Sequence, residues 1–230
     1  MGRSTVLGTL GRLALFAASH SALAAPPVKR RLGQADGDRR AEGVYRLAYN
    51  AVSVLATGAL VRSLWRLPDR QLYRVGGPAR AAMVAAQGVG VLGTLAVARE
   101  VGPARFSGLA PLADLLAGRP PSAVPTAQHP VPAADGDLRW GGPFRLCRHP
   151  NNAFPLLVLG FAPTMTAKLA TFSLGTAAYM VVGSWHEERR LQAAFGGQFE
   201  RYRRDVPHLL LPLGQVPRPP RRRAPAAPHG

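Results

Sequence analysis

Cysteine is nearly absent from this sequence, since Cys147 is the only one among 230 residues. One cysteine excludes an internal disulfide and any metal site built from several cysteines. Aromatic residues make up only 7%, which is little for a protein that stacks nucleic-acid bases. Acidic residues are also scarce: 12 Asp and Glu stand against 29 Lys and Arg, and the formal net charge is +17. That charge is compatible with nucleic-acid binding, with contact to anionic lipid, or with a membrane protein whose cytoplasmic loops are cationic.

The apolar residues lie in long blocks that arginine-rich loops separate. One block runs over residues 4–25. The second, Val44 to Trp65, is long enough to cross a hydrocarbon core of about 30 Å at 1.5 Å per residue. The third, over 79–98, is rich in Ala and Gly, as is typical of close helix–helix contact in a membrane. The blocks favour a membrane protein and make an exported nucleic-acid-binding protein the least favoured class.

Two interpretations of the first block stay open. Its apolar run and the small residues ALAA resemble a secretory signal with a cleavage site. Alternatively, it is a first transmembrane helix whose cytoplasmic end is marked by Lys29, Arg30 and Arg31. Positive charge directly after the apolar run opposes export, so the helix is favoured.

The second half of the chain predicts a helical hairpin followed by an amphipathic helix. The apolar region from Asn152 to about Trp185 is interrupted at Ala162–Lys168, which suits a turn between two shorter spans. After it, apolar residues recur at helical spacing on one face. These residues are Leu191, Phe195, Phe199 and Tyr202.

The expected fold class is all-α: a polytopic membrane helical bundle with about five transmembrane helices and a C-terminal cytoplasmic amphipathic helix. We divide the chain into N-terminal membrane helices (1–98), a connecting loop (99–140), a region with the hairpin (141–213) and a disordered basic tail (214–230). Arginine-rich segments normally face the cytoplasm. The protein is therefore expected in a membrane, the inner membrane if the source is bacterial, with its C-terminus in the cytoplasm.

Charged residues gather at the two outer ends of the predicted hairpin. Because the arms of a hairpin bring their outer ends together, Arg148 and His149 should approach Glu187 and Glu188. Cations beside carboxylates suit a zwitterionic ligand, since arginine pairs with a carboxylate and glutamate with an amine or ribose hydroxyls. The plainer interpretation is that these four residues form salt bridges that hold the outer ends of the hairpin together without a ligand. We call this arrangement a structural hairpin neck.

The same region resembles the membrane methyltransferases of the isoprenylcysteine carboxyl methyltransferase and phospholipid methyltransferase group. The similarity extends in order from Gly142 to Pro212, about 70 residues. The matching residues are Gly142-Pro143-Phe144-Arg145, Arg148-His149-Pro150, Glu187-Glu188, Phe195-Gly196, Phe199, Tyr202, Val206-Pro207 and Pro212. One position departs from the group, which usually has tyrosine where this chain has Asn152.

The resemblance implies methyl transfer from S-adenosylmethionine, with no metal. The cofactor-binding residues that it implies are Arg148, His149, Pro150, Glu187, Glu188, Phe199 and Tyr202. It assigns no catalytic residue. The implied acceptor is lipophilic or small and membrane-accessible: an isoprenylcysteine carboxylate, a thiol or a lipid amine. Membrane lipids are expected partners and nucleic acid is not. The Asn152 departure leaves the acceptor open.

A second hypothesis is a non-enzymatic membrane protein of the same fold, linked to nitrite and nitric oxide metabolism. The apolar helices of the N-terminal half have some similarity to such proteins, and the Asn152 departure is the best support. Binding of S-adenosylmethionine separates the two hypotheses.

The charge distribution predicts a cytoplasmic C-terminus, because arginine is abundant after Trp185 and cationic segments stay inside. A reporter enzyme that is active only outside the cytoplasm, fused after Gly230, should therefore stay silent. A cytoplasmic reporter at the same position is the control. Full activity of the first reporter would overturn the topology.

Overall fold

The computed structural model describes residues 2–25, 27–28, 39–119, 138 and 140–209. Four features predicted from the sequence lie outside these residues: the cations Lys29, Arg30 and Arg31, part of the connecting loop, Pro212, and the basic tail. The described elements are α1 (Gly2–Ala24), α3 (Arg39–Trp65), β1 (Gln71–Arg74), α4 (Gly77–Val101), α5 (Pro103–Ser107), α6 (Leu109–Leu116), the 3-10 helix η1 (Gly142–Arg145), α7 (Pro150–Gly160), β2 (Thr164–Thr166), α8 (Ala167–Phe195) and α9 (Gly197–Asp205).

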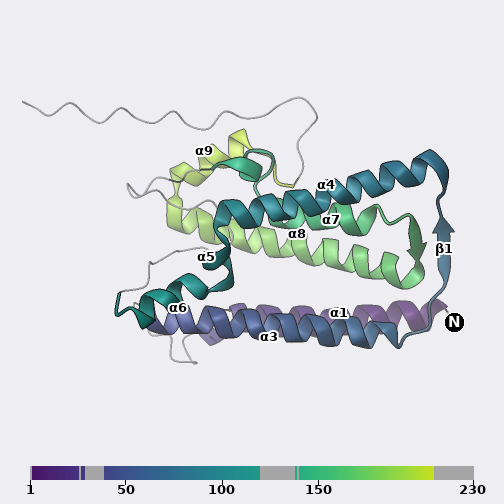
Figure 1. Ribbon diagram of the computed structural model, residues 1–230, viewed down its shortest axis with the longest axis horizontal. Helices are drawn as coiled ribbons and strands as arrows, with labels where there is room; N and C mark the ends of the chain where they lie inside the picture. The colour runs from purple at the N-terminus through teal and green to yellow at the C-terminus, as the bar shows by residue number, and fades with distance from the viewer. Residues whose placement is uncertain (1, 26, 29–38, 120–137, 139, 210–230) are drawn as a thin grey trace, which may run out of the picture.

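The long helices lie roughly parallel to one axis in two groups (Figure 1). Helices α1 and α3 form one group, and α4, α7 and α8 form the other. The contact between α1 and α8 joins the two groups. The strands β1 and β2 lie at one end of the bundle, while α9 and η1 lie at the other end. The C-terminal end of α1 and the start of α3 are at the same end as α9.

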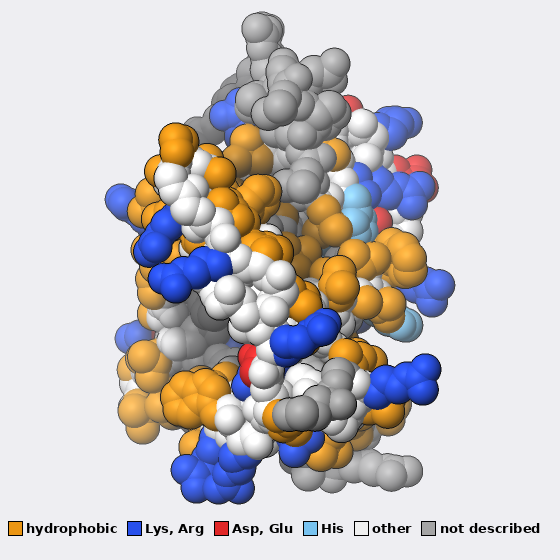
Figure 2. Space-filling model, turned by 90° about the vertical axis from the view of Figure 1, so that its right-hand side faces the viewer, with side chains coloured by type: hydrophobic (Ala, Val, Ile, Leu, Met, Phe, Trp, Pro, Cys, Tyr) orange, Lys and Arg blue, Asp and Glu red, His pale blue; other side chains and the backbone are white. Residues whose placement is uncertain are grey.

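Among the described residues, three helices are long and apolar enough to cross a membrane: Arg3–Ala24, Val44–Trp65 and Gly77–Val101. Their outer faces carry large apolar side chains that are mostly exposed, such as Leu15 and Leu55, each at 73%. Figure 2 views the end that carries β1 and β2 and shows hydrophobic side chains on the flanks with cationic ones among them. Exposed apolar surface of this extent indicates contact with lipid.

The expected count of about five spans stays a prediction. Helix α7 has 11 residues, or about 16 Å at 1.5 Å per residue, and is too short to cross a hydrocarbon core of about 30 Å by itself. Helix α8 has 29 residues and is long enough to cross the core. It is less apolar over a membrane-spanning length than the three helices named above.

The chain turns between α7 and α8 in the interval that the sequence marked as an interruption. Strand β2 lies in this turn and pairs antiparallel with β1, with Tyr73 opposite Met165. Thr166 caps α8, since its side chain accepts a hydrogen bond from the Leu169 amide. Asp69 reinforces the junction because its Oδ1 accepts the Lys168 amide at 3.0 Å. The sequence did not predict this small sheet, so the fold is helical with one two-stranded addition.

Two segments differ from the sequence-based expectation. Residues 103–116 were expected to be loop but form α5 and α6, which pack on α3. Gly102 and Gly108 have φ of 92° and 88°, a backbone region that favours glycine, and they separate these helices from their neighbours. The amphipathic helix is also broken at Gly196, with φ of 49°, so its two halves are the end of α8 and α9.

Polar side chains within the apolar blocks make helix–helix contacts. The Tyr49 hydroxyl is 2.7 Å from His20 Nε2 and joins α3 to α1. Asn50 Nδ2 donates to the Ser107 carbonyl at 2.8 Å and joins α3 to α5. Polar groups in a membrane usually face the bundle interior in this way.

Small residues allow two helix pairs to approach closely in mid-helix. A Cβ atom at Gly90 of α4 would lie 2.7 Å from the Phe154 carbonyl oxygen and 2.8 Å from Val158 Cγ2 of α7. A Cβ atom at Gly175 of α8 would lie 2.5 Å from Leu13 Cδ2 of α1. Close backbone approach at small residues is the usual form of helix contact in membranes.

We expect Gly90→Ala to destabilise the protein by about 1–3 kcal/mol, because the added methyl group meets the backbone of α7. Gly88→Ala is the matched control, since nothing lies within 4 Å of a Cβ atom there and helix propensity favours alanine by up to about 1 kcal/mol. The measurement is reversible unfolding with SDS in mixed micelles, followed by circular dichroism. Equal stability of the two variants would contradict the α4–α7 packing described.

Candidate functional site

A compact apolar core supports the end of the bundle that carries α9. Its buried members are Val97, Val101, Leu138, Trp140, Phe144, Leu191, Phe199, Tyr202 and Val206. The Tyr202 hydroxyl donates to the Phe144 carbonyl at 2.8 Å, and its ring lies 4.7 Å from that of Trp140. The core thus fixes α9 and η1 against the end of α4. The polar residues that follow η1 in the sequence are therefore held in place by this packed core.

Arg148 is buried at this end and bonds to three parts of the chain. Its Nε donates to Glu188 Oε1 of α8 at 2.7 Å. Its Nη1 donates to the Arg203 carbonyl at 2.9 Å and also to the Val206 carbonyl. The last carbonyls of a helix have no partner within the helix, so the guanidinium caps the C-terminal end of α9 while it pairs with α8.

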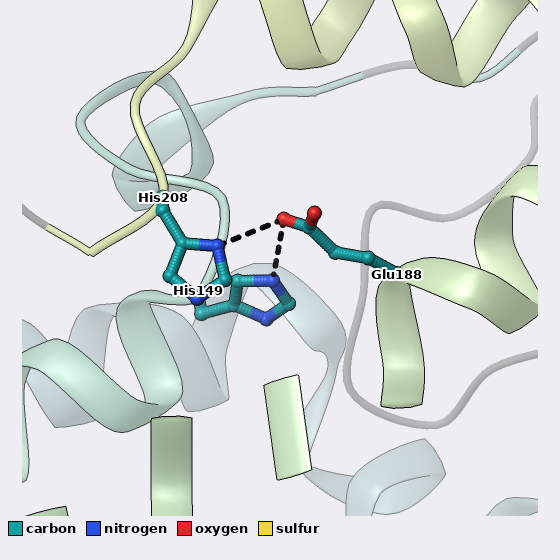
Figure 3. A group of neighbouring side chains, drawn as sticks. All are labelled: His149, Glu188 and His208. Carbon is teal, nitrogen blue, oxygen red and sulfur yellow. Dashed lines mark hydrogen bonds and ion pairs between the residues drawn. The ribbon is translucent and has the colours of Figure 1, made fainter. Parts of the chain in front are cut away.

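The residues after α9 lie along the residues before α7. The Arg148 amide donates to the Pro207 carbonyl at 2.8 Å, and the His149 amide donates to the His208 carbonyl at 3.2 Å. These backbone bonds bring the His208 ring to the His149 ring, with centroids 4.8 Å apart. Figure 3 shows both imidazoles pointing toward the same carboxylate oxygen of Glu188.

Glu188 is the common partner of the cluster. Its Oε1 lies 3.1 Å from His149 Nε2 and 3.1 Å from His208 Nδ1, in addition to the Arg148 bond. Burial alone would raise the pKa of the Glu188 carboxyl, but hydrogen bonds from His149 and Arg148 and the guanidinium charge outweigh burial and lower the pKa to about 2. The carboxyl is therefore ionised at neutral pH.

The structure brings together four of the residues that the sequence singled out. Arg148, His149 and Glu188 are in direct contact, and Glu187 Oε2 lies 3.8 Å from His149 Nδ1. Pro150 occupies the first turn of α7, where its missing N–H needs no partner.

The other residues that the sequence singled out pack around this cluster and are not members of it. Phe199 and Tyr202 are each 1% exposed and belong to the apolar core. Asn152, the position that departs from the methyltransferase group, donates to the Met180 carbonyl at 3.3 Å and joins α7 to α8. Cys147 is buried, and burial raises the pKa of its thiol to about 12. It is therefore a packing residue with little thiolate at neutral pH.

Sequence reasoning missed His208 and Ser184. His208 Nε2 is 2.8 Å from Ser184 Oγ, so His208 links α8 to the segment after α9. His208 follows directly after Val206-Pro207, and this adjacency to the last matched dipeptide was the available signal. Ser184 lies one turn before Glu188 on α8, and nothing in the sequence distinguishes it from other small helical residues.

The cluster offers a ligand both signs of charge at the end of an apolar bundle. Arg148 supplies a guanidinium, Glu187 and Glu188 supply carboxylates, and two imidazoles supply nitrogen atoms that donate or accept. The side chains of Arg148 and Glu188 are 10% and 14% exposed. Electrostatic interactions are stronger in such a partly desolvated place than in water.

Comparison with known proteins finds similarity in short stretches. No protein-family model and no solved structure matches the chain. A protein of Bradyrhizobium diazoefficiens named methanethiol S-methyltransferase 2 is 40% identical over 67 residues, which are 29% of this chain and 26% of that protein. Proteins named methanethiol S-methyltransferase from Pseudomonas deceptionensis and Mycobacterium tuberculosis are 30% identical over 91 residues and 40% identical over 73 residues. The matches cover between 26% and 35% of these relatives' length.

Tyr202→Phe should lower stability by about 1–3 kcal/mol, because the Phe144 carbonyl would lose its hydrogen bond within the core. Tyr73→Phe is the control, since Tyr73 is 38% exposed on β1. Unfolding with SDS in mixed micelles measures both variants. If Tyr202→Phe matched the control, the hydroxyl would contribute nothing to holding η1 on α9.

Proposed function

We propose that this protein is an integral membrane methyltransferase that uses S-adenosylmethionine and methylates a small thiol. The observation that carries the proposal is the meeting of Arg148, His149 and Glu188 at 2.7 and 3.1 Å, residues that belong to the signature shared with membrane methyltransferases. The names of the relatives point to a methyltransferase and to methanethiol as the acceptor class. A prenylcysteine carboxylate and a lipid amine are the other acceptors to be tested.

The residues present fit the methyl donor. When bound, S-adenosylmethionine supplies a methyl group on a sulfonium, together with a carboxylate, an amine and ribose hydroxyls. Arg148 would hold the carboxylate, with His149 beside it, and Glu187 or Glu188 would hold the amine or ribose. All three Arg148 nitrogens have partners in the protein. The contact of Nη2 with His208 Nδ1 is the longest of them, at 3.4 Å, so Nη2 is the end that would exchange its partner for a ligand carboxylate.

The surroundings of the cluster also fit a ligand. Trp140 Nε1 is buried without a hydrogen-bond partner in the described part of the chain, and the Trp140 ring packs on Tyr202. A buried donor without a partner is costly, and an acceptor atom of a ligand would satisfy it. Pro150 would shape the start of the hairpin, while Phe199 and Tyr202 would support the cofactor side from within the core.

Methyl transfer between two sulfur atoms asks the protein mainly for positioning and exclusion of water. The acceptor would lose its S–H proton to solvent and react as the thiolate. It would gain an S–C bond as the S–CH3 bond of the donor breaks, and the donor would leave as a neutral thioether. Two carboxylates next to the site favour a sulfonium cation over a neutral ligand. The apolar helices beside the cluster favour an acceptor that dissolves in lipid, and we place the protein in the bacterial inner membrane with this end in the cytoplasm.

A second candidate function is a non-enzymatic membrane protein linked to nitrite and nitric oxide metabolism. The favouring observation is that Arg148 already bonds to Glu188 and to two carbonyls of the chain. Such bonds are also those of a structural hairpin neck, and buried ion pairs occur without any ligand.

The test is titration of S-adenosylmethionine against the full chain purified in detergent, followed by transfer of a labelled methyl group to methanethiol with dimethyl sulfide as the product. Arg148→Ala and Glu188→Gln should weaken donor binding roughly ten- to a hundredfold, because a lost charged hydrogen bond costs about 1.5–3 kcal/mol and a factor of ten is about 1.4 kcal/mol. Arg148→Lys should lose less, since it keeps the charge but not the planar fork.

Arg201→Ala, an exposed change on α9, is the matched control and should bind normally. Absence of donor binding by the wild-type chain at millimolar concentration would sink the enzyme proposal and favour the structural neck. Normal binding by Arg148→Ala and Glu188→Gln would instead move the donor to another place in the protein.

A further inference from the structure

We propose that His149, Glu188 and His208 form a binding site for a divalent transition-metal ion of the zinc type, and that this ion competes with the methyl donor for Glu188. The first part stands on the geometry of the three side chains alone. The second part rests on the function proposed above. Two imidazoles and one carboxylate are a ligand set that zinc accepts.

The ligand atoms are already close to the separations of a metal site. His149 Nε2 and His208 Nδ1 each lie 3.1 Å from Glu188 Oε1, and all three groups offer an atom within 4.8 Å of the others (Figure 3). Zinc bonds of about 2.0–2.1 Å in a tetrahedron place neighbouring ligand atoms roughly 3.3 Å apart. Two of the three separations are close to this value, and the third is at most 4.8 Å.

The contact between His208 and Glu188 itself calls for a cation. Ser184 Oγ lies 2.8 Å from the Val181 carbonyl and can only donate to it, so the same oxygen accepts from His208 Nε2–H. In a neutral imidazole that is protonated at Nε2, Nδ1 carries a lone pair. A lone pair facing a carboxylate oxygen at 3.1 Å is repulsive unless a positive group offsets it. Arg148 Nη2, which is 3.4 Å from the same Nδ1, offsets it in part, and a proton or a metal ion between the two atoms would remove the repulsion.

The outer nitrogen of each imidazole has a partner of the kind found around metal sites. His208 Nε2 is held by Ser184, and His149 Nδ1 lies 3.8 Å from Glu187 Oε2. Metal-ligating histidines nearly always have a carboxylate, carbonyl or similar group on the second nitrogen, which fixes the ring and its tautomer. The His208 ring is oriented in this way by Ser184, and the Glu187 carboxylate lies on the outer side of the His149 ring beyond hydrogen-bond distance.

The charges around the three ligands also favour a dication. Glu187 and Glu188 contribute two negative charges and Arg148 one positive charge, which leaves a net charge of −1. Arg148 bonds to Glu188 Oε1 through Nε, and a carboxylate oxygen has a second lone pair for the ion. A carboxylate bound to the ion no longer serves a ligand amine, so the ion and the methyl donor exclude each other where Glu188, rather than Glu187, holds that amine.

The experiment uses the full chain in detergent, with affinity tags removed and metal stripped by a chelator. Zinc chloride is titrated against a chromogenic chelator, first without the methyl donor. We expect one tightly bound ion per chain. His208→Gln and Glu188→Gln should each weaken binding by more than the roughly 10–100-fold that loss of an outer partner costs, and Ser184→Ala should lose within that range. His186→Gln, an exposed histidine on the same helix, is the matched control and should bind as wild type.

Cobalt(II) provides a second measurement on the unaltered chain. Intense visible bands, typical of four-coordinate cobalt with histidine ligands, support the site, and weak six-coordinate bands overturn it. Absence of zinc binding, or equal binding by the His208→Gln and Glu188→Gln variants, also overturns it. Zinc should raise the apparent Kd for S-adenosylmethionine in wild type and not in His208→Gln, and an unchanged Kd in wild type refutes the competition. If the wild type binds no donor, the proposed function and the competition fail, while the zinc titration still decides the metal site.

Discussion

The guanidinium of Arg148 holds three segments at one point: the end of α8, the C-terminal carbonyls of α9 and the start of α7. A buried ion pair gains little by itself, because desolvation opposes the attraction of its two charges. Here the desolvation cost of burying Arg148 and Glu188 is offset by the hydrogen bonds that the guanidinium makes to Glu188 and to the carbonyls of Arg203 and Val206. The arrangement of His149 and His208 depends on this pair, since the backbone bonds that align their rings begin at Arg148.

The proposed ligand site and the structural hairpin neck consist of the same set of atoms. Arg148 and Glu188 satisfy each other when the chain stands alone, and each would exchange part of that bonding for a ligand group of the opposite charge. A zwitterion offers both groups at once, whereas a metal ion replaces only the contacts made by the two imidazoles. The cluster therefore discriminates between ligands by how many of its own bonds each one can replace.

The sequence predicted the parts of the fold that depend on local pattern. The length of the apolar blocks predicted the three long helices, and the polar interruption predicted the turn between α7 and α8. The geometry of a hairpin predicted that Arg148 would lie near Glu188. It did not predict the helices at 103–116, because their glycines and prolines favour loop while packing on α3 stabilises helix. It also missed His208, whose place is set by backbone bonds to residues about sixty positions away, such as His149. A contact between residues so far apart in the sequence produces no periodic pattern from which it could be predicted.

The glycine contacts in mid-helix restrict the routes by which a lipid-soluble molecule reaches the polar cluster. Gly90 brings α4 onto α7, and Gly175 brings α8 onto Leu13 of α1, with no space for an added methyl group at either place. Gly175 lies about 20 Å from Glu188 along α8 at 1.5 Å per residue. The α4–α7 and α1–α8 pairs leave no path between their helices at these glycines, so a lipid-soluble acceptor of the proposed reaction would approach at the polar cluster's own level, where the apolar bundle ends.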